Sequence, residues 1–198
     1  RGLHLWDVLN GVWAVPLVLL VRALRPMVLI RLGNLHSERI GNFVAQGAEQ
    51  IARLKFQPNN TIDWFWLGKS CNSQWEKMIR RTLPIHDWVR YLDWWNRVLP
   101  GGLDHARPNS FTNCRDVEGL YSRYDVKIPF CPSETSEAME WLKSKGWREG
   151  EPFICLLVRD REYLANDKLH GDGSIQARNI WSYHDYRNSD INTYLSAI

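Results

Sequence analysis

The chain has 198 residues, of which 44% are hydrophobic and 24% are charged, and this length suits one large domain or two small ones. The composition excludes a disordered tail, a collagen-like repeat and a small disulfide-dense scaffold. A net charge of +3 is too small to indicate a nucleic-acid partner. The 11 tryptophans favour a large aromatic core, an interface or sugar-stacking surfaces.

The N-terminal quarter combines the basic excess of the chain with its most apolar run. Residues 1–55 hold seven Lys or Arg against three Asp or Glu. Residues 12–21 (VWAVPLVLLV) are apolar, but Asp7 and Arg22 flank a stretch that is shorter than the ~20 residues a spanning helix needs. Three interpretations stay open for residues 1–25: a membrane-surface helix, a helix packed on the domain, and a shortened anchor.

A strand–helix–strand pattern follows. The runs MVLIRL (27–32) and TIDWFWL (61–67) are rich in β-branched and aromatic residues and predict buried strands. Between them, apolar residues recur at helical spacing over residues 40–55. This is the pattern of a parallel α/β unit, so we predict an α/β fold with a Rossmann-like parallel sheet.

The rest of the chain continues the alternation. We predict helices over 73–83, 85–99 and 133–145, a loop over 103–130, a polar loop from 159 to 182 and a helix from 189 to 198. The run PFICLLV (152–158) is apolar on both faces and predicts a central parallel strand, with Cys155 as a small core residue. Because no following strand is visible and the chain starts at Arg1, we expect it to be the N-terminal part of a longer protein.

Two loops follow predicted strands, where ligands bind in open parallel sheets. In the first, GNLHSERIGN (33–42), Gly33 and Gly41 bracket polar residues, and a helix start could hold an anion on its backbone N–H groups. The loop is neither a GxGxxG nor a Walker A sequence, so an ordinary turn capped by Ser37 stays open. The four Cys and six His show no recurring ligand spacing, and no metal is expected.

The second loop region joins RDREY (159–163) to YHDYRNSD (183–190). The stem of Arg159 is fixed by the preceding apolar run, and its guanidinium could bind a diphosphate in a bidentate manner. Ser189 and Asp190 could instead cap the following helix.

The remaining polar residues of this region also leave alternatives open. Arg187 could bind a ligand phosphate or pair with Asp160 or Asp185. His184 could be a base or an ordinary surface histidine. Since no Ser–His–Asp order, HExxH, paired-carboxylate signature or P-loop is visible, the catalytic base is unknown.

Three ordered segments resemble a group of bacterial glycosyltransferases encoded among genes for cell-surface polysaccharide. The segments are VLIRLGNLHSERIGNFVAQ, FICLLVRDREYL and SYHDYRNSDINTYLSAI. The matching residues are Arg31, Gly33, Arg39, Ile40 and Gly41 in the first, Val158, Arg159, Asp160 and Tyr163 in the second, and Tyr186, Arg187, Ser189, Asp190 and Ile191 in the third. Family members often have His where this chain has Asn42.

The segment VRDREY is also similar, more distantly, to fucosyltransferases with two facing Rossmann-like domains, the GT-B architecture. The resemblance implies a truncated GT-B-like glycosyltransferase with a nucleotide-sugar donor and a cell-surface glycan acceptor, inactive as this fragment alone. The implied parts are an apolar segment at 1–25, an acceptor-side domain at 26–130, a helix and linker at 131–150 and the start of the donor-side domain at 151–198. No cofactor beyond the substrate is expected, and the implied location is cytoplasmic, with a peripheral position at the inner membrane face as one possibility.

The resemblance also implies roles for particular residues. The donor diphosphate would contact Arg159, Arg187 and Ser189. The acceptor-side loop would comprise Gly33, Arg39, Gly41 and Asn42. Candidates for the catalytic residue are His36, His184 and Asp190.

A different class of protein stays open beside the transferase. Aromatic faces stack on sugars, so a non-enzymatic module that binds a glycan or a protein partner would use the tryptophan-rich segments. The same residues also lie at spacings typical of a core. They are Trp64, Trp66, Trp75, Trp88, Trp94 and Trp95.

Overall fold

The structure is a computed structural model that describes residues 11–55, 60–107, 119–159, 166 and 174–197. The chain divides into two compact units, Arg1–Phe130 and Cys131–Ile198. Each unit is described here by itself. The boundary falls where the predicted helix-and-linker segment begins.

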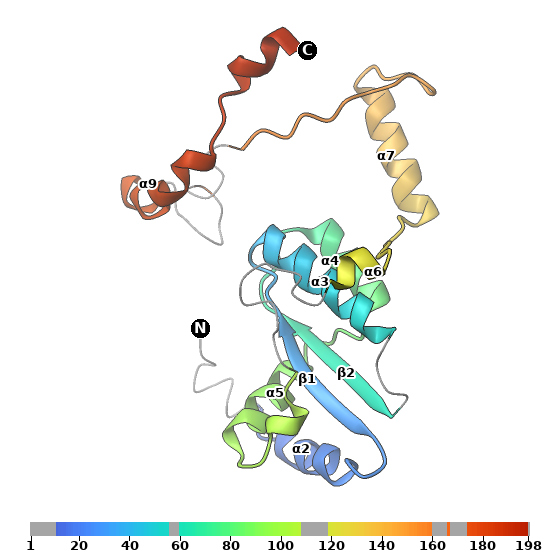
Figure 1. Cartoon of the computed structure of the whole chain (residues 1–198), viewed down its shortest axis with the longest axis vertical. Coiled ribbons are helices and arrows are strands. Elements are labelled where there is room, and N and C mark those ends of the chain that lie inside the picture. Colours follow the sequence, from blue (N-terminus) through green and yellow to red (C-terminus); the bar gives the residue numbers. More distant parts are fainter. Residues whose placement is uncertain (1–10, 56–59, 108–118, 160–165, 167–173, 198) are drawn as a thin grey trace. The chain divides into compact units, whose positions relative to one another are not determined.

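Unit 1 alternates helices and strands in the predicted order (Figure 1). Its elements are α2 (Ala14–Ala23), β1 (Leu29–Leu35), α3 (Ile40–Leu54), β2 (Thr61–Leu67), α4 (Ser73–Thr82), α5 (Val89–Val98), the 3-10 helix η1 (Leu103–His105) and α6 (Leu120–Arg123). The mixed α/β class is therefore confirmed. The prediction of a loop over 103–130 is wrong where η1 and α6 form.

The sheet is small and parallel. Strands β1 and β2 pair from Leu29 opposite Thr61 to Leu35 opposite Leu67. Isolated parallel bridges extend it on both sides, from Phe65 to Ile85 and from Leu32 to Ala106. Four parallel chain segments thus lie in the order Ile85, β2, β1, Ala106. The prediction that a helix starts at Ile85 is wrong, because this residue bridges β2 and α5 begins only at Val89.

The two faces of the sheet carry separate cores, because alternate residues of a strand point to opposite faces. On one face, α2 and α5 enclose Ile30 and Leu32 of β1. On the other face, α3 and α4 cover Leu35, and Phe65 lies beside Phe43 of α3. Helices on both faces explain why both strands are rich in apolar residues.

Strand β1 is longer than predicted, and Gly33 lies inside it rather than in a loop. A Cβ on Gly33 would lie 2.8 Å from the Cβ of Arg107. The backbone N–H of Arg107 donates to the Leu32 carbonyl at 2.8 Å, so the two chain segments are in direct contact. Close approach of these segments, rather than ligand binding, accounts for glycine at this position.

Helix α2 packs on unit 1 through Ala14, Val18 and Val21, which confirms the interpretation of a helix packed on the domain. Arg22 is part of this contact, since its guanidinium donates to the carbonyl groups of Asn96, Leu99 and Pro100 at the end of α5. Unpaired carbonyls at a helix C-terminus need such donors.

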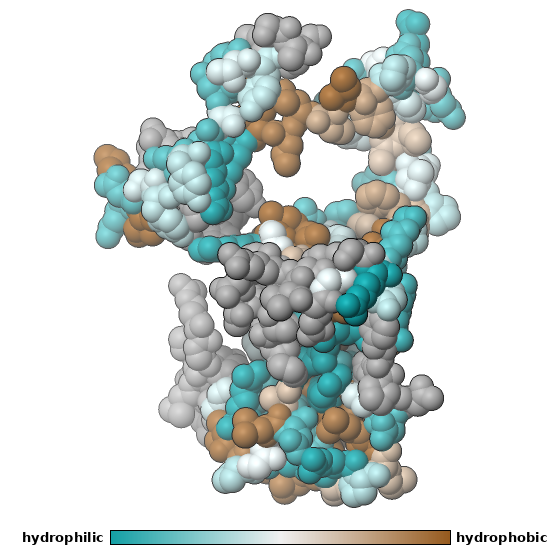
Figure 2. All heavy atoms as spheres, viewed as in Figure 1, coloured by the Kyte–Doolittle hydropathy of each residue, from teal (hydrophilic) through white to brown (hydrophobic). Residues whose placement is uncertain are grey.

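The other face of α2 is exposed, and apolar residues gather at this end of unit 1 (Figure 2). The exposed residues are Val12, Trp13, Leu17, Leu19 and Leu20. No helix among the described residues combines the length and apolarity that crossing a bilayer requires. A membrane-surface role for α2 stays a prediction.

Unit 2 contains α7 (Pro132–Ser144), α9 (Ile175–Trp181) and the 3-10 helices η2 (Ser182–Arg187) and η3 (Ile191–Ala197). The N-cap of α7 is Cys131, whose backbone N–H donates to the Glu134 carboxylate at 2.9 Å. The helix therefore begins one residue before the predicted start at 133. The predicted loop up to 182 is also wrong where α9 forms.

The predicted central strand at 152–158 is absent from unit 2. This segment has no regular secondary structure, and Ile154 and Leu157 are 94% and 97% exposed. Cys155 is exposed as well, so its assignment to a core is wrong. A strand forms only when a neighbouring strand takes its backbone hydrogen bonds, and no described residue of unit 2 pairs with this segment. Figure 2 shows apolar atoms along the extended segment between α7 and α9.

Candidate functional site at the carboxyl edge of the sheet

The carboxyl ends of β1 and β2 lie at the same edge because the strands are parallel. The two following segments, 36–39 and 68–72, are joined directly. The Cys71 backbone N–H donates to the Ser37 carbonyl at 2.9 Å, and Ser37 Oγ donates to the Lys69 carbonyl at 3.2 Å. Ser37 is fully buried and does not cap α3, whose N-cap is Arg39. These bonds hold the edge in one arrangement.

His36 is exposed at this edge, and Gln46 of α3 fixes its ring. The His36 backbone N–H donates to Gln46 Oε1 at 2.7 Å. Since Oε1 of the Gln46 amide accepts this bond, the Nε2 end of the amide faces the ring. Gln46 Nε2 donates to Nδ1 of the imidazole at 2.8 Å. With Nδ1 accepting, the neutral ring carries its proton on Nε2. His36 therefore presents a hydrogen-bond donor, and in this state it is not a general base.

Replacing Gln46 with Glu is expected to switch the tautomer of His36. A carboxylate accepts from both the backbone N–H and the ring, so Nδ1 must then carry the proton. The ¹⁵N chemical shifts of the imidazole distinguish the two tautomers. Gln50→Glu, on the same helix, is the control and should leave these shifts unchanged. A native ring carrying its proton on Nδ1 would contradict the assignment.

Glu38 also belongs to this edge, and the sequence analysis missed it. One oxygen of its carboxylate lies 2.7 Å from the place that a Cβ on Gly68 would occupy. Glu38 lies in the first segment that resembles the glycosyltransferases, but the residues that match the family there include Arg39 and the two glycines and not Glu38. A carboxylate opposite a glycine in another loop leaves no signal in a single sequence.

The remaining residues of the predicted acceptor-side loop lie in α3. Gly41 is exposed and Asn42 is half-buried. A Cβ on Gly41 would meet no atom within 4 Å, whereas a Cβ on Gly47 would lie 2.8 Å from Ile79 Cδ1. Glycine at position 41 thus has no packing explanation, in contrast to glycine at position 47.

Gly41→Ala is therefore expected to raise the free energy of unfolding by up to about 1 kcal/mol, because alanine restricts the unfolded chain and favours the helix. Urea unfolding followed by circular dichroism measures the change. Gly47→Ala is the matched variant in the same helix, and its clash with Ile79 should destabilise the protein. A loss of stability in Gly41→Ala would show that the residue has a packing role.

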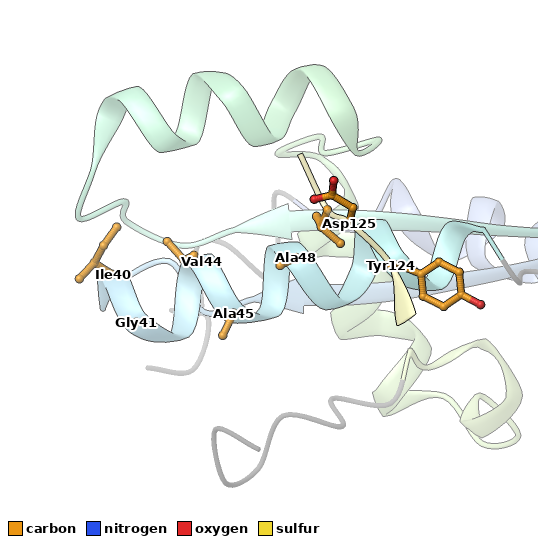
Figure 3. Close-up of a pocket in the computed structure, with 8 residues that line it drawn as sticks. Ile40, Gly41, Val44, Ala45, Ala48, Tyr124 and Asp125 are labelled. Atoms are coloured by element: carbon orange, nitrogen blue, oxygen red, sulfur yellow. The ribbon is translucent and has the colours of Figure 1, made fainter. Parts of the chain in front are cut away.

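A largely apolar pocket of about 560 Å³ runs along α3 from this edge. Figure 3 shows Ile40, Val44 and Ala48 spaced along the helix. Tyr124 and Asp125 come from the segment after α6. Sequence analysis missed the pocket because it placed residues 124 and 125 in a featureless loop.

A second, polar pocket of about 710 Å³ lies at the carboxyl end of β2. We call it the β2 pocket, and its lining residues are Trp66, Leu67, Gly68, Lys69, Glu76, Arg80, Asp87, Trp88, Arg90 and Tyr91. Burial by itself would lower the pKa of Arg80, but its hydrogen bonds to Asp87 and Glu76 raise that pKa above its ordinary value. Arg80 is therefore a fixed cation in the pocket wall.

The residues predicted for donor phosphate lie in unit 2. The backbone N–H of Ser189 donates to the carbonyl of Arg159 at 2.9 Å, so two of the three are adjacent. Arg187 Nε donates to the Tyr186 hydroxyl at 2.7 Å, and the guanidinium lies 5.1 Å from the centre of that ring.

Two of the candidate catalytic residues, Asp190 and His184, lie in unit 2. Asp190 Oδ1 accepts from the Asn192 backbone N–H at 2.9 Å, so Asp190 caps η3. His184 lies in η2, and its side chain is outside the described residues, as is all of Asp160. The carboxylate of Asp190 thus has a structural role at the start of η3.

Five of the six tryptophans of the rival interpretation lie in a core or in the β2 pocket, and Trp94 meets Trp95 edge-on with ring centres 4.7 Å apart. Trp64, Trp66 and Trp95 pack against one core and Trp75 against the other. Only Trp66 and Trp88 line the β2 pocket. No group of three metal-ligating side chains occurs among the described residues.

Comparisons with known proteins add no relative. No family model, curated protein or solved structure matches the chain. The resemblance to glycosyltransferases is therefore a prediction, and the site is interpreted from its own geometry.

Proposed function

We propose that this chain is part of a GT-B-like glycosyltransferase that moves a sugar from a nucleotide-sugar donor to a cell-surface glycan. In this proposal unit 1 is the acceptor-side domain, and unit 2 begins the donor-side domain. The observation that carries it is the order of the four parallel segments in unit 1.

That order, Ile85–β2–β1–Ala106, corresponds to the strand order 3-2-1-4 of a doubly wound α/β fold. In such folds the direction of strand addition reverses between the first and fourth strands, and ligands bind there beyond the carboxyl ends. In this chain the reversal lies between β1 and Ala106. His36 follows β1 at this point, and Arg107 follows Ala106, which supports an acceptor site at this edge.

The chemistry is displacement at the anomeric carbon of the donor. An acceptor hydroxyl oxygen forms the new bond, the bond from the sugar to the diphosphate oxygen breaks, and the diphosphate leaves with the electron pair. Arg159, with Arg187 and the Ser189 hydroxyl, would stabilise the negative charge of the leaving group. His36 would donate a hydrogen bond from Nε2 to the acceptor. Glu38, a carboxylate at the same edge, is the proposed base for the hydroxyl proton.

The test is a donor screen with UDP-, GDP-, dTDP- and CMP-sugars by calorimetry, on this chain and on the full-length gene product. Arg159→Ala in the full-length protein should lose about 2–4 kcal/mol of transition-state stabilisation, as other removed anion-stabilising donors do. The control is Arg148→Ala, since Arg148 is an exposed cation in a turn of unit 2. Unchanged turnover in Arg159→Ala would reject the role of this arginine.

A second candidate function is a non-enzymatic glycan-binding module, which the aromatic lining of the β2 pocket favours. Saturable glycan binding with no binding of any nucleotide-sugar, in folded protein, would support this candidate over the transferase. For the transferase we propose a cytoplasmic location at the inner membrane face, supported by the exposed apolar side of α2. Co-sedimentation with anionic lipid vesicles checks that location.

A further inference from the structure

The β2 pocket and the carboxyl edge share a wall. Gly68 and Lys69 line the pocket, and both also lie against the segment 36–39 that follows β1. Ser37 Oγ donates to the Lys69 carbonyl at 3.2 Å, and a carboxylate oxygen of Glu38 lies 2.7 Å from the place that a Cβ on Gly68 would occupy. A ligand in the pocket would therefore lie next to Glu38, the base in the proposed transfer.

Two of the three cations that line the pocket have partners within the protein. Arg80 Nε donates to Glu76 Oε1 at 2.9 Å, and Arg80 Nη2 donates to Asp87 Oδ1 at 2.8 Å. The Arg90 guanidinium donates to the Tyr91 hydroxyl, lies 4.6 Å from the centre of that ring and has a further partner. Both arginines are thus held by the protein itself.

The third cation, Lys69, is exposed, and the Glu38 carboxylate stands at Gly68, the preceding residue. With Glu38 included, three carboxylates stand against the three cations of the pocket. A charged ligand would therefore meet repulsion as well as attraction. A ligand with hydroxyl groups and no net charge suits such a wall, because carboxylates accept from hydroxyls and cationic side chains donate to them.

The aromatic residues of the pocket are held in place from behind. Trp88, 39% exposed, stacks on His86 with ring centres 5.5 Å apart and meets Trp64 edge-on at 5.3 Å. The indole N–H of Trp66 donates to the buried carboxylate of Asp93 at 2.9 Å. Rigid aromatic surfaces lose little conformational entropy when a ligand binds.

We propose that the β2 pocket is a subsite for the second sugar of the acceptor chain, a neutral β-linked hexose of the glucose type. The inference rests on the proposed function and adds that the acceptor is an oligosaccharide. Equatorial hydroxyls would point from the edge of this ring to Glu76 and Asp87, and its C–H face would stack on Trp88.

The subsite extends the acceptor site proposed above and does not replace it. The terminal sugar, whose hydroxyl reacts, stays at the reversal between β1 and Ala106, beside His36. The ends of neighbouring strands lie about 4.8 Å apart, a step that two linked sugar rings can bridge. The second sugar would then cross the shared wall at Gly68 into the pocket.

The test compares methyl β-cellobioside, which has two glucose units, with methyl β-glucoside, which has one, by ligand-observed NMR on the whole chain. The disaccharide is expected to bind about tenfold more tightly, because it fills both subsites. Trp88→Ala and His36→Ala should each remove this gain, since either variant leaves one working subsite. Trp88→Phe, which keeps an aromatic face, should retain most of the gain. Trp94→Ala is the control, because Trp94 belongs to α5 and is outside the pocket lining.

Equal affinity for the two glycosides would overturn the inference, as would a gain that survives in Trp88→Ala. A gain that depends on Trp88 but survives in His36→Ala would also overturn it, because the pocket would then bind glycan apart from the acceptor site. The outcome is separable from that of the transferase proposal, whose donor contacts lie in unit 2. A gain that depends on both residues, without nucleotide-sugar binding, keeps the subsite and rejects the transferase, and Arg159-dependent donor binding without a gain does the reverse.

Discussion

Asp63→Ala is expected to destabilise unit 1 by about 3–5 kcal/mol, as removal of one partner from a buried ion pair does. Asp63 lies in β2 and is 3% exposed. Its carboxylate accepts two hydrogen bonds from the neighbouring strand, from Arg31 Nε at 2.6 Å and Nη2 at 2.9 Å. Arg107 Nε lies 3.4 Å from the same carboxylate.

The cost arises mainly from the two guanidinium groups that would be left behind. Burial already lowers the pKa of Arg107, and the charge of Asp63 opposes that effect. Without the carboxylate, Arg31 and Arg107 would face each other across one face of the sheet, and Arg107 would keep only the weaker attraction of Glu49 as anionic compensation. The hydrogen bonds of the Arg107 guanidinium to Gln50 Oε1, from Nε at 2.9 Å and from Nη2 at 2.7 Å, would remain.

Urea unfolding of the chain, monitored by tryptophan fluorescence, measures the change. Asp104→Ala is the control, because Asp104 pairs with Arg25 at the surface, where both side chains are more than half exposed. An exposed pair contributes between about 0 and 1 kcal/mol. Equal stability losses in the two variants would show that Asp63 is not the centre of a buried network.

Phe43→Ala has the second large expected effect, again about 3–5 kcal/mol. Phe43 is fully buried and joins α3 to the sheet beside Phe65. Its ring meets Trp75 of α4 edge-on, with centres 6.4 Å apart. Truncation removes this aromatic contact and leaves a cavity between α3, α4 and the sheet. The cavity can close only if α3 moves.

Val44→Ala is the control for Phe43, since Val44 is the next residue of α3 and is exposed. It should change the free energy of unfolding by less than about 1 kcal/mol. In Phe43→Ala the displacement of α3 should also loosen Gln46 and so the ring of His36. A Phe43 variant that keeps wild-type stability would contradict the placement of α3 on this core.

The elements of unit 1 were predictable because their signals are local. The strand at Thr61–Leu67 has the predicted bounds, and α3 ends within one residue of its predicted end. The bounds of β1 were not predictable, because a glycine after an apolar run predicts a loop. The close contact with Arg107 that explains Gly33 is visible only in the structure. Ile85 was placed in a helix because a single parallel bridge leaves no periodicity in the sequence.

The segment at 152–158 is a case in which a local pattern predicted a strand that does not form. Its apolar run is typical of a buried strand, and the pattern was correctly seen, but hydrophobicity does not specify a pairing partner. The candidate site was likewise predictable only in its local part. The carboxyl edge could be predicted from strand order, whereas the bond between Gln46 and His36 and the lining of the β2 pocket depend on contacts between distant residues.

The bonds from Arg22 to the end of α5 also bear on how the protein is made. They join residues 74 to 78 positions apart in the sequence. During synthesis, which proceeds from the N-terminus, α2 emerges long before the carbonyl groups that its arginine will bind. Val18 and Val21, buried in the finished domain, can meet Ile30 and Leu32 of β1 early, but they lack Val89 and Leu92 until α5 has left the ribosome. A nascent chain of this protein therefore leaves the α5-facing side of α2 open to chaperones or lipid during that interval.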